Sequence, residues 1–397
     1  MKAPCRYDSF RNRNRSFRYR NTMLTSGVTT RVSQLADGRD IVYYDDADTT
    51  LPAERSADLR TLEPRPLTAT MRQDVLTGEW ISIAASRQNR VVLPPAELDP
   101  LAPQSPTNPS EVPSNYDVAV FENRSPSFGP ALSGENAPLG LADLDELGIG
   151  RTRTSVGRCE VVCFSPERTG SFGSLSRSRA RTVIEAWADR TAELSALEGI
   201  QQVFPFENRG EAIGVTLHHP HGQIYAYPYI TPRTQQLVSS VEAYGPTLFE
   251  DILRSERAGE RLILSGDHWS AFVPFAARWP LEVHMLPHRQ VADFAETNIE
   301  ERDELAVLYL RLLRAVDALY RTPTPYIAAW HQAPVAAHHD DIRLMLQLTS
   351  PRRAADKLKF LAGSEAAMGA WIGDVPPEKQ AKQLRAALAK SDEENPV

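Results

Sequence analysis

The residues with the clearest capacity for chemistry lie in one short segment, 208–223, which reads NRGEAIGVTLHHPHGQ. It brings three imidazoles close together, those of His218, His219 and His221. Pro220 fixes a backbone dihedral between the last two histidines and removes an amide donor. Gly222 allows the chain to pass close to a neighbouring group. Such a bend can present one imidazole nitrogen to a substrate while an acceptor holds the other nitrogen and selects the tautomer.

Three interpretations of these histidines are open. A histidine can be a satisfied core or surface residue without any chemistry. Two histidines one residue apart can also be zinc ligands, because imidazole supplies Zn–N bonds. The third interpretation is a nucleophilic histidine that forms a covalent intermediate. The complete HPHGQ string, with Asn208 upstream, is more specific than any single histidine and favours the nucleophile.

The elements that would position this bend are strands and long helices. Strand-like runs flank it, at 203–206 and 224–230. Apolar side chains spaced i, i+3, i+4 predict one helix over 176–197 and another over 297–320. Thr297 and Glu300 form a capping box at the start of the second helix.

The remaining pattern predicts many short strands and a few further helices. A hairpin is expected over 28–44, with its turn at Asp37-Gly38. Further strands are expected at 80–83, 157–164, 261–264, 269–275, 281–286 and 342–348. The segment 117–128 is expected to hold a buried strand followed by a polar turn at Asn123-Arg124. Helices are expected over 232–257 with a break near Gly245, over most of 353–371, and over 377–390. Because strands and helices do not alternate as βαβ units, the pattern favours an α+β fold, with antiparallel sheets and helices packed on one side.

The length of 397 residues suits two domains of roughly 100–200 residues each. We expect a basic tail over 1–27, a hairpin and linker over 28–70, and domains over 71–232 and 233–397. Residues 1–22 carry seven Lys and Arg against one Asp and lack the apolar core of a secretory signal. A disordered tail, a transit peptide or a true start at Met23 are the open alternatives.

The composition, with 42% hydrophobic and 24% charged residues, is ordinary for a soluble protein. A net charge of −7 does not suggest a nucleic-acid or membrane-surface binder. No apolar run approaches the roughly 20 residues of a membrane helix. The cysteines, which are Cys5, Cys159 and Cys163, form no Cys-x-x-Cys pair or disulfide framework, which indicates a cytoplasmic protein.

Several segments in one order resemble a known family. They read DVLTGEW, VFENR, GRCEVVCFSPE, PFENRGEAIG, HPHGQ, WPLEVHMLP, WHQAP and KFLAGSE. Together they are similar to the galactose-1-phosphate uridylyltransferases, a branch of the histidine-triad superfamily, from about Arg72 to Leu388. The resemblance implies two histidine-triad-like lobes, of which only the first is catalytic. It also implies a homodimer whose active sites are each completed by the partner subunit.

The resemblance also assigns roles to individual residues. His221 would take a uridylyl group from UDP-glucose and pass it to galactose 1-phosphate, with Gln223 donating to phosphoryl oxygens. His219 belongs to the same catalytic motif. Further positions match the family's substrate-binding residues; they are Arg87, Arg90, Asn123, Asn208, Gly214, Thr216, Lys359, Phe360 and Glu365.

The chain departs from the family's metal sites. Many members bind zinc through a Cys-x-x-Cys pair and two histidines, but the matching loop here reads Asp99-Pro100-Leu101-Ala102. A further ligand position falls near Arg168, and only His219 remains. We therefore expect no zinc at this position.

The second metal site of the family also lacks most of its ligands. Its glutamate position falls near Leu237, its His-x-His strand carries Leu344 and Leu346, and only His331 remains. The leucines indicate an apolar replacement, worth about 1.5–3 kcal/mol for each buried side chain. A nearby loop could form another ligand cluster or simply be solvated, which is the preferred interpretation; it holds His338, His339, Asp340 and Asp341. No cofactor is expected.

Two other functions remain open. A relative that binds nucleotide without turnover would keep the fold and serve as a sensor or scaffold. A phosphorylase or hydrolase acting on dinucleoside polyphosphates would share the histidine but not the C-terminal sugar-binding segment. The presence of His221, Gln223, Asn208 and Arg87 favours the transferase.

Overall fold

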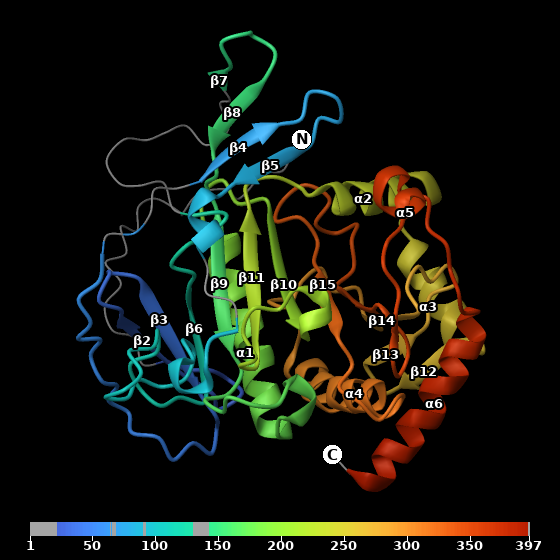
Figure 1. Cartoon of the computed structure of the whole chain (residues 1–397). Helices are drawn as coiled ribbons and strands as arrows, with labels where there is room; N and C mark the ends of the chain where they lie inside the picture. Colours follow the sequence, from blue (N-terminus) through green and yellow to red (C-terminus); the bar gives the residue numbers. More distant parts are fainter. Residues whose placement is uncertain (1–21, 64, 66–68, 90–92, 130–142, 396–397) are drawn as a thin grey trace, which may run out of the picture.

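The computed structural model describes residues 22–395 apart from 64, 66–68, 90–92 and 130–142. A 12-stranded antiparallel sheet dominates it and runs from β2 and β3 on the left of Figure 1 to β12 on the right. In spatial order its strands are β1 (Thr22–Met23), β2 (Thr29–Gln34), β3 (Asp40–Asp45), β6 (Val118–Glu122), β9 (Arg158–Cys163), β11 (His221–Tyr227), β10 (Gln202–Arg209), β15 (Tyr326–His331), β16 (Met345–Ser350), β14 (Leu281–Pro287), β13 (Trp269–Phe272) and β12 (Leu262–Ser265).

Helices and small sheets complete the fold. The α-helices are α1 (Arg177–Ser195), α2 (Pro232–Tyr244), α3 (Leu248–Ala258), α4 (Ile299–Ala318), α5 (Gly363–Met368) and α6 (Pro377–Glu394). Short 3-10 turns are η1 (Ala85–Asn89), η2 (Ala96–Leu98), η3 (Phe172–Ser174) and η4 (Glu211–Ile213). A four-stranded sheet, whose β7–β8 hairpin projects at the top of Figure 1, is formed by β5 (Trp80–Ile83), β4 (Thr70–Gln73), β8 (Arg151–Thr154) and β7 (Asp143–Leu144). A two-stranded sheet joins β17 (Arg352–Ala354) and β18 (Lys357–Leu358). The α+β class with antiparallel sheets is confirmed.

The large sheet is built from two halves with the same connectivity. In the first half the chain passes through β6, β9, α1, β10 and β11, and the strands lie in the order β6-β9-β11-β10. In the second half it passes through β13, β14, α4, β15 and β16, and the order is β13-β14-β16-β15. The halves meet where β10 pairs with β15, with Asn208 opposite Ile327. His221 begins β11, whereas Met345 begins the corresponding β16, so only the first half carries a histidine at the start of this strand.

The main core lies where α1 and α4 pack against each other and against the sheet. Trp187 of α1 stacks on Phe172 at a centroid distance of 5.5 Å and lies 5.9 Å from Trp330 of β15. The predicted apolar stripe of α1 is buried, from Ala180 to Leu194. Because these residues recur at helical spacing, the sequence predicted both the helix and its buried face.

Three predicted details are wrong. The capping box of α4 uses Asn298 and Glu301, whose backbone amides and side chains bond reciprocally, so the cap lies one residue after the predicted Thr297. The late strand begins at Met345 rather than at residue 342. Residues 353–371 are mostly not helical, because the β17–β18 hairpin occupies 352–358 and only α5 is helical.

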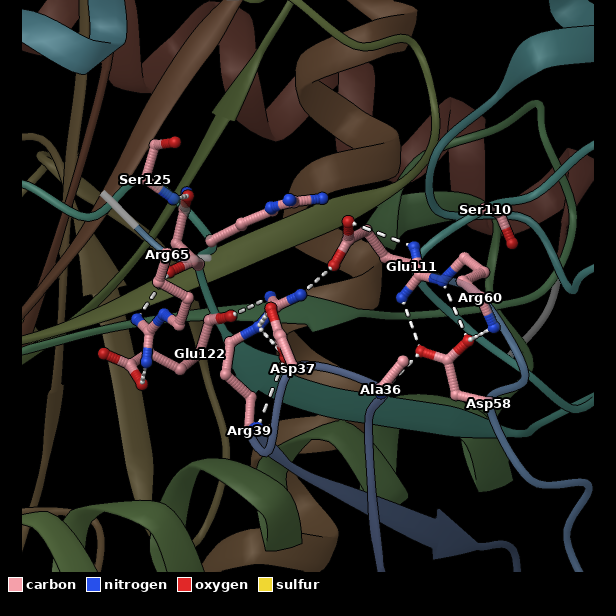
Figure 2. Close-up of polar contacts among 12 residues, drawn as sticks. Ala36, Asp37, Arg39, Asp58, Arg60, Arg65, Ser110, Glu111, Glu122 and Ser125 are labelled. Carbon is pink, nitrogen blue, oxygen red and sulfur yellow. Dashed lines mark hydrogen bonds and ion pairs between the residues drawn. The ribbon is translucent and has the colours of Figure 1, made fainter. Parts of the chain in front are cut away.

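Ion pairs tie the N-terminal hairpin to the loop between η2 and β6, which contains Glu111 (Figure 2). Arg39 is buried and bonds to Asp37 and Glu111 and to the carbonyl of Glu122. Arg60 pairs with Asp58 at 2.7 Å and with Glu111 at 3.3 Å. Glu111 is thus held by two guanidinium groups, and the loop around it is fixed against the hairpin. Of the predicted basic tail, residues 1–21 lie outside the described residues, while Thr22 and Met23 pair with β2.

Candidate active site

His221 occupies the first position of β11, and its side chain shares one face of that strand with Gln223. Side chains at 221, 223, 225 and 227 are half-buried, whereas Gly222, Ile224 and Ala226 are buried on the other face, as the period of two requires. Gly222 lies against Phe164, where a Cβ would come within 2.8 Å of the ring and 3.0 Å of the Phe206 carbonyl. The absent side chain therefore lets β11 approach its neighbours beside the histidine.

A hydrogen bond within the bend at residues 219–221 fixes the orientation of the His221 ring. Its Nδ1 lies 2.7 Å from the carbonyl oxygen of His219, and because a carbonyl only accepts, Nδ1 carries the proton. Nε2 has no hydrogen-bond partner among the described residues and keeps its lone pair. Burial lowers the pKa of His221 and outweighs the hydrogen bond to the His219 carbonyl, which raises it, so the neutral ring is favoured. This is the tautomer that a nucleophilic Nε2 requires.

His219 is buried and held at both ring nitrogens. Nδ1 lies 2.7 Å from the Asp99 carboxylate, and Nε2 lies 2.8 Å from the Ser165 carbonyl and 3.0 Å from the Tyr116 hydroxyl. Burial alone would raise the pKa of Asp99, but the hydrogen bond and charge of His219 outweigh it and lower that pKa. A ring engaged in this way has no nitrogen left for a metal ion.

The residues at the family's zinc position therefore do not fit zinc. Asp99 and His219 bond to each other, and the guanidinium of Arg168 donates to the carbonyl of Ala96 in the same loop. In the part of the chain that the structure describes, no group of three His, Cys, Asp or Glu side chains could hold a metal ion.

The second metal position is a hydrogen-bonded cluster, which the sequence did not predict. His331 Nε2 lies 3.1 Å from the Gln347 amide oxygen, and Gln347 donates to Glu282 at 2.8 Å. Burial lowers the pKa of His331 to about 4, so the ring is neutral. Leu344 and Leu346 are buried in the main core, as expected. The prediction of a purely apolar replacement is wrong, because β16 places Gln347 beside the histidine.

The loop with His338 and His339 makes contacts with carboxylates. His338 lies 3.1 Å from Asp341, and His339 lies 3.0 Å from Glu296. Each of these two histidines contacts one carboxylate.

A pocket of about 1040 Å³ opens at the His221 end of β11. Asn208 and His221 line it together with the 3-10 turn η3 and the ends of α4 and α6. Arg209 also lines it and pairs with Asp317 at 2.7 Å. The structure thus brings the predicted Asn208, His219 and His221 together around one cavity large enough for a small ligand.

An aromatic surface continues from Gln223 along the same face. Phe206 lies 5.1 Å from Phe204 and 5.1 Å from Tyr225, and Phe128 lies 5.2 Å from Tyr227. Such rings can stack against a planar base. These aromatic residues were not predicted as part of the site, although tyrosines at 225, 227 and 229 alternate in phase with His221 and Gln223.

The other predicted substrate-binding residues of the first half that the structure describes lie outside the strands, in short turns and loops. Arg87 lies on η1, and its Nη1 is buried without a hydrogen-bond partner among the described residues. The Asn123 amide oxygen accepts from the Ser125 backbone, 3.0 Å away. Gly214 ends η4 with a positive φ of 82°, and the Thr216 carbonyl accepts from Leu93. Arg90 lies outside the described residues.

The predicted C-terminal sugar-binding residues lie in a different part of the chain. Lys359 is buried and pairs with Glu365 at 2.6 Å, whereas Phe360 is 77% exposed. Of the described residues that line the pocket, none comes from this segment. Within one subunit the structure does not bring these three residues to His221.

Comparisons with known proteins match both halves of the chain to one family. Residues 65–231 match the N-terminal domain of galactose-1-phosphate uridyl transferase, and residues 232–395 match its C-terminal domain. The chain is 42% identical over 374 residues to galactose-1-phosphate uridylyltransferase from Streptomyces lividans, covering 89% of this chain and 96% of that relative. It is 33% identical over 323 residues to the Thermotoga maritima protein of the same name, covering 79% and 97%. A solved uridylyltransferase structure is 29% identical with a TM-score of 0.71, covering 81% and 99%.

An antiparallel α+β fold with a tautomer-fixed histidine at a pocket defines the class of site, and the sequence matches define the family. The chain belongs to the galactose-1-phosphate uridyl transferase family. It is accordingly an enzyme, a nucleotidyltransferase. Among the described helices, none is both long and apolar enough to cross a membrane.

Proposed function

We propose that this enzyme transfers a uridylyl group from UDP-glucose to galactose 1-phosphate through a covalent intermediate on His221. The observation that carries the proposal is the 2.7 Å hydrogen bond from His221 Nδ1 to the His219 carbonyl, which leaves Nε2 as the nucleophilic atom. The names of the relatives, galactose-1-phosphate uridylyltransferase, supply the substrates. The role in galactose metabolism follows from those substrates.

The first half-reaction begins with attack of the Nε2 lone pair on the α-phosphorus of UDP-glucose. An N–P bond forms, the bond from that phosphorus to the bridging oxygen breaks, and glucose 1-phosphate leaves with the oxygen and its electron pair. Because Nδ1 already holds the proton, the uridylylated ring becomes a cation, and the His219 carbonyl accepts from it throughout. The amides of Gln223 and Asn208 are the proposed donors to the phosphoryl oxygens, a role in which one lost donor costs about 10²–10³ in rate.

The second half-reaction reverses this order. A phosphate oxygen of galactose 1-phosphate attacks the same phosphorus, the N–P bond breaks, and its electrons return to Nε2. UDP-galactose leaves, and His221 regains its neutral Nδ1–H tautomer. The two substrates thus use one nucleophile in turn, which is a ping-pong mechanism.

The remaining assignments rest on the family resemblance. Arg87, Arg90, Asn123, Gly214 and Thr216 would contact the nucleotide, with the division into two lobes near residue 232. Because Lys359, Phe360 and Glu365 lie away from the pocket of their own chain, they would reach a sugar phosphate in a partner subunit of a homodimer. A cytoplasmic location fits the two buried, unpaired cysteines Cys159 and Cys163.

Replacing His221 with asparagine tests the proposal. His221→Asn keeps a polar side chain of similar size but removes the nucleophile, so transfer from UDP-glucose to galactose 1-phosphate should fall by more than about 10³-fold. The melting temperature should stay near that of the wild type. His339→Asn, at a surface ion pair away from the pocket, is the matched control and should keep full activity. Wild-type turnover in His221→Asn would overturn the assignment.

A further inference from the structure

We infer that Asp99 is a positioning residue for the nucleophile, acting through His219 on the carbonyl that orients His221. The inference rests on the proposed function, since it concerns the same histidine. Its physical basis is a chain of contacts that begins at the Asp99 carboxylate, passes through the His219 ring and peptide, and ends at His221 Nδ1.

The His219 ring is clamped from opposite sides by separate parts of the chain. Asp99 Oδ2 holds Nδ1 at 2.7 Å, and the Ser165 carbonyl holds Nε2 at 2.8 Å. The ring is buried, with 3% of the residue exposed, so it has no room for another orientation. His219 precedes Pro220, and the proline ring restricts the backbone of the residue before it, so a fixed His219 side chain leaves the His219 carbonyl little freedom of direction. That carbonyl is the acceptor for His221 Nδ1.

Asp99 can act as an anchor because its own loop is fixed. Its second oxygen, Oδ1, accepts from the Leu101 amide at 2.9 Å, and its carbonyl accepts from the Asn108 side chain at 2.7 Å. The Tyr116 hydroxyl donates to the Leu101 carbonyl, 2.7 Å away. Farther along the loop, Glu111 is held by the arginine pair of Figure 2. Hydrogen bonds within the loop therefore hold the Asp99 carboxylate in one position.

The Asp99–His219 pair lies at the position where many members of the family that this chain resembles bind zinc. A metal would fix the first histidine of the motif through a bond to its ring; here the residues do not fit a metal, and a carboxylate fixes the ring instead. Partners behind a reactive group orient it, and their loss typically lowers activity by about 10–100-fold. Asp99 is not among the residues that line the pocket, and its carboxylate bonds to His219 and Leu101 rather than to His221, so we expect its effect to appear in the orientation of His221.

The test compares Asp99→Ala and Asp99→Asn with the wild type. Asp99→Ala should lower kcat by about 10–100-fold and change KM for galactose 1-phosphate by less than about 3-fold, because the sugar site is not touched. Asp99→Asn should recover much of that loss, because its amide oxygen can still accept from His219. Glu256→Gln is the control for loss of a buried ion pair, because Glu256 bonds to Arg261 far along the chain and should leave kcat unchanged.

A second readout does not depend on turnover. Nitrogen NMR of histidine-labelled enzyme should show His221 as a single Nδ1–H tautomer in the wild type and as a mixture of tautomers in Asp99→Ala. Wild-type kcat together with a wild-type His221 spectrum in that variant would overturn the inference. If Asp99→Ala does not fold, Asp99→Ser takes its place, because the shorter side chain cannot span the 2.7 Å contact to His219 Nδ1. An unchanged His221 spectrum and an unchanged kcat in Asp99→Ser would count against the inference. If His221→Asn retained activity, the proposed function would fail, while the tautomer comparison would still decide the role of Asp99.

Discussion

Two buried glutamates show how strongly the surroundings of one side chain set its charge. The carboxylate of Glu160 in β9 accepts two hydrogen bonds of 2.8 Å from the guanidinium of Arg190. Burial would raise the pKa of Glu160, but the charge of Arg190 outweighs it and lowers that pKa. Glu207 of β10 accepts from Tyr326 at 3.0 Å, and its other oxygen has no partner among the described residues. Burial raises the pKa of Glu207 to about 7.

The raised pKa predicts that Glu207→Gln stabilises the protein at high pH. A carboxyl whose folded pKa exceeds its unfolded value of 4.5 favours folding below that value and loses this contribution as pH rises through about 7. A neutral glutamine avoids the loss, so the gain in the free energy of unfolding should reach about 1–3 kcal/mol at pH 8 and vanish near pH 4. Urea denaturation at both pH values measures it, and an equal gain at both would contradict the explanation.

Glu160→Gln should have the opposite effect. It leaves the buried Arg190 without its charged partner, which typically costs about 3–5 kcal/mol. Because the folded pKa of Glu160 is lowered, its contribution is present above the unfolded pKa and is lost as pH falls. The difference from the wild type should therefore be largest at neutral pH and shrink in acid. A Glu160→Gln protein as stable as the wild type at pH 7 would show that the ion pair does not stabilise the fold.

At the same scale, the sequence predicted where His221 lies but not the residues that hold it. HPHGQ is contiguous, so spacing and the period of two placed His221 and Gln223 together on one face. Asp99 lies 120 residues from His219, and no local pattern reveals that pair. Gln347 was missed for a similar reason, because only the register of β15 with β16 brings it to His331.

At the scale of elements, β11 depends on the close contact that Gly222 allows. Gly222→Ala would press a methyl group against Phe164 and the Phe206 carbonyl, so we expect a loss of about 1–3 kcal/mol in stability. Transfer should also fall, because His221 is the adjacent residue. Gly363→Ala is the control, since a Cβ there meets nothing within 4 Å. Thermal unfolding and transfer assays measure both variants, and a Gly222→Ala protein that behaves like the control would show that β11 can shift freely.

Elements whose apolar residues recur at a regular spacing could be predicted from the sequence. Elements that depend on contacts between residues far apart in the sequence could not. The stripes of α1 and α4 were buried as expected because packing follows helical spacing. The stretch 353–371 has helix-forming residues, yet Lys359 bonds to Glu365 and the backbone of Arg278 instead of continuing a helix. The strands β4, β7 and β8 are short and polar, and pairing with neighbouring strands rather than an apolar pattern defines them: β4 pairs with β5 and β8, and β7 pairs with β8.

At the scale of the whole molecule, the two halves repeat one connectivity, but only one carries the histidine at the start of the equivalent strand. The proposed homodimer would bring Phe360 of one subunit to His221 of the other. Phe360→Ala removes an exposed ring and should not unfold the protein. We expect this variant and His221→Asn to be impaired alone and to regain activity when they are refolded together, because a mixed dimer contains one intact site. A mixture no more active than the sum of its parts would contradict shared active sites.

The central claim is the covalent uridylyl group on His221, and intact-mass spectrometry tests it most directly. Purified, chelator-treated enzyme mixed with UDP-glucose should gain one uridylyl unit, and addition of galactose 1-phosphate should remove it. His221→Asn should gain nothing. A wild-type enzyme that binds UDP-glucose without any mass gain, or a gain that persists in His221→Asn, would contradict the account.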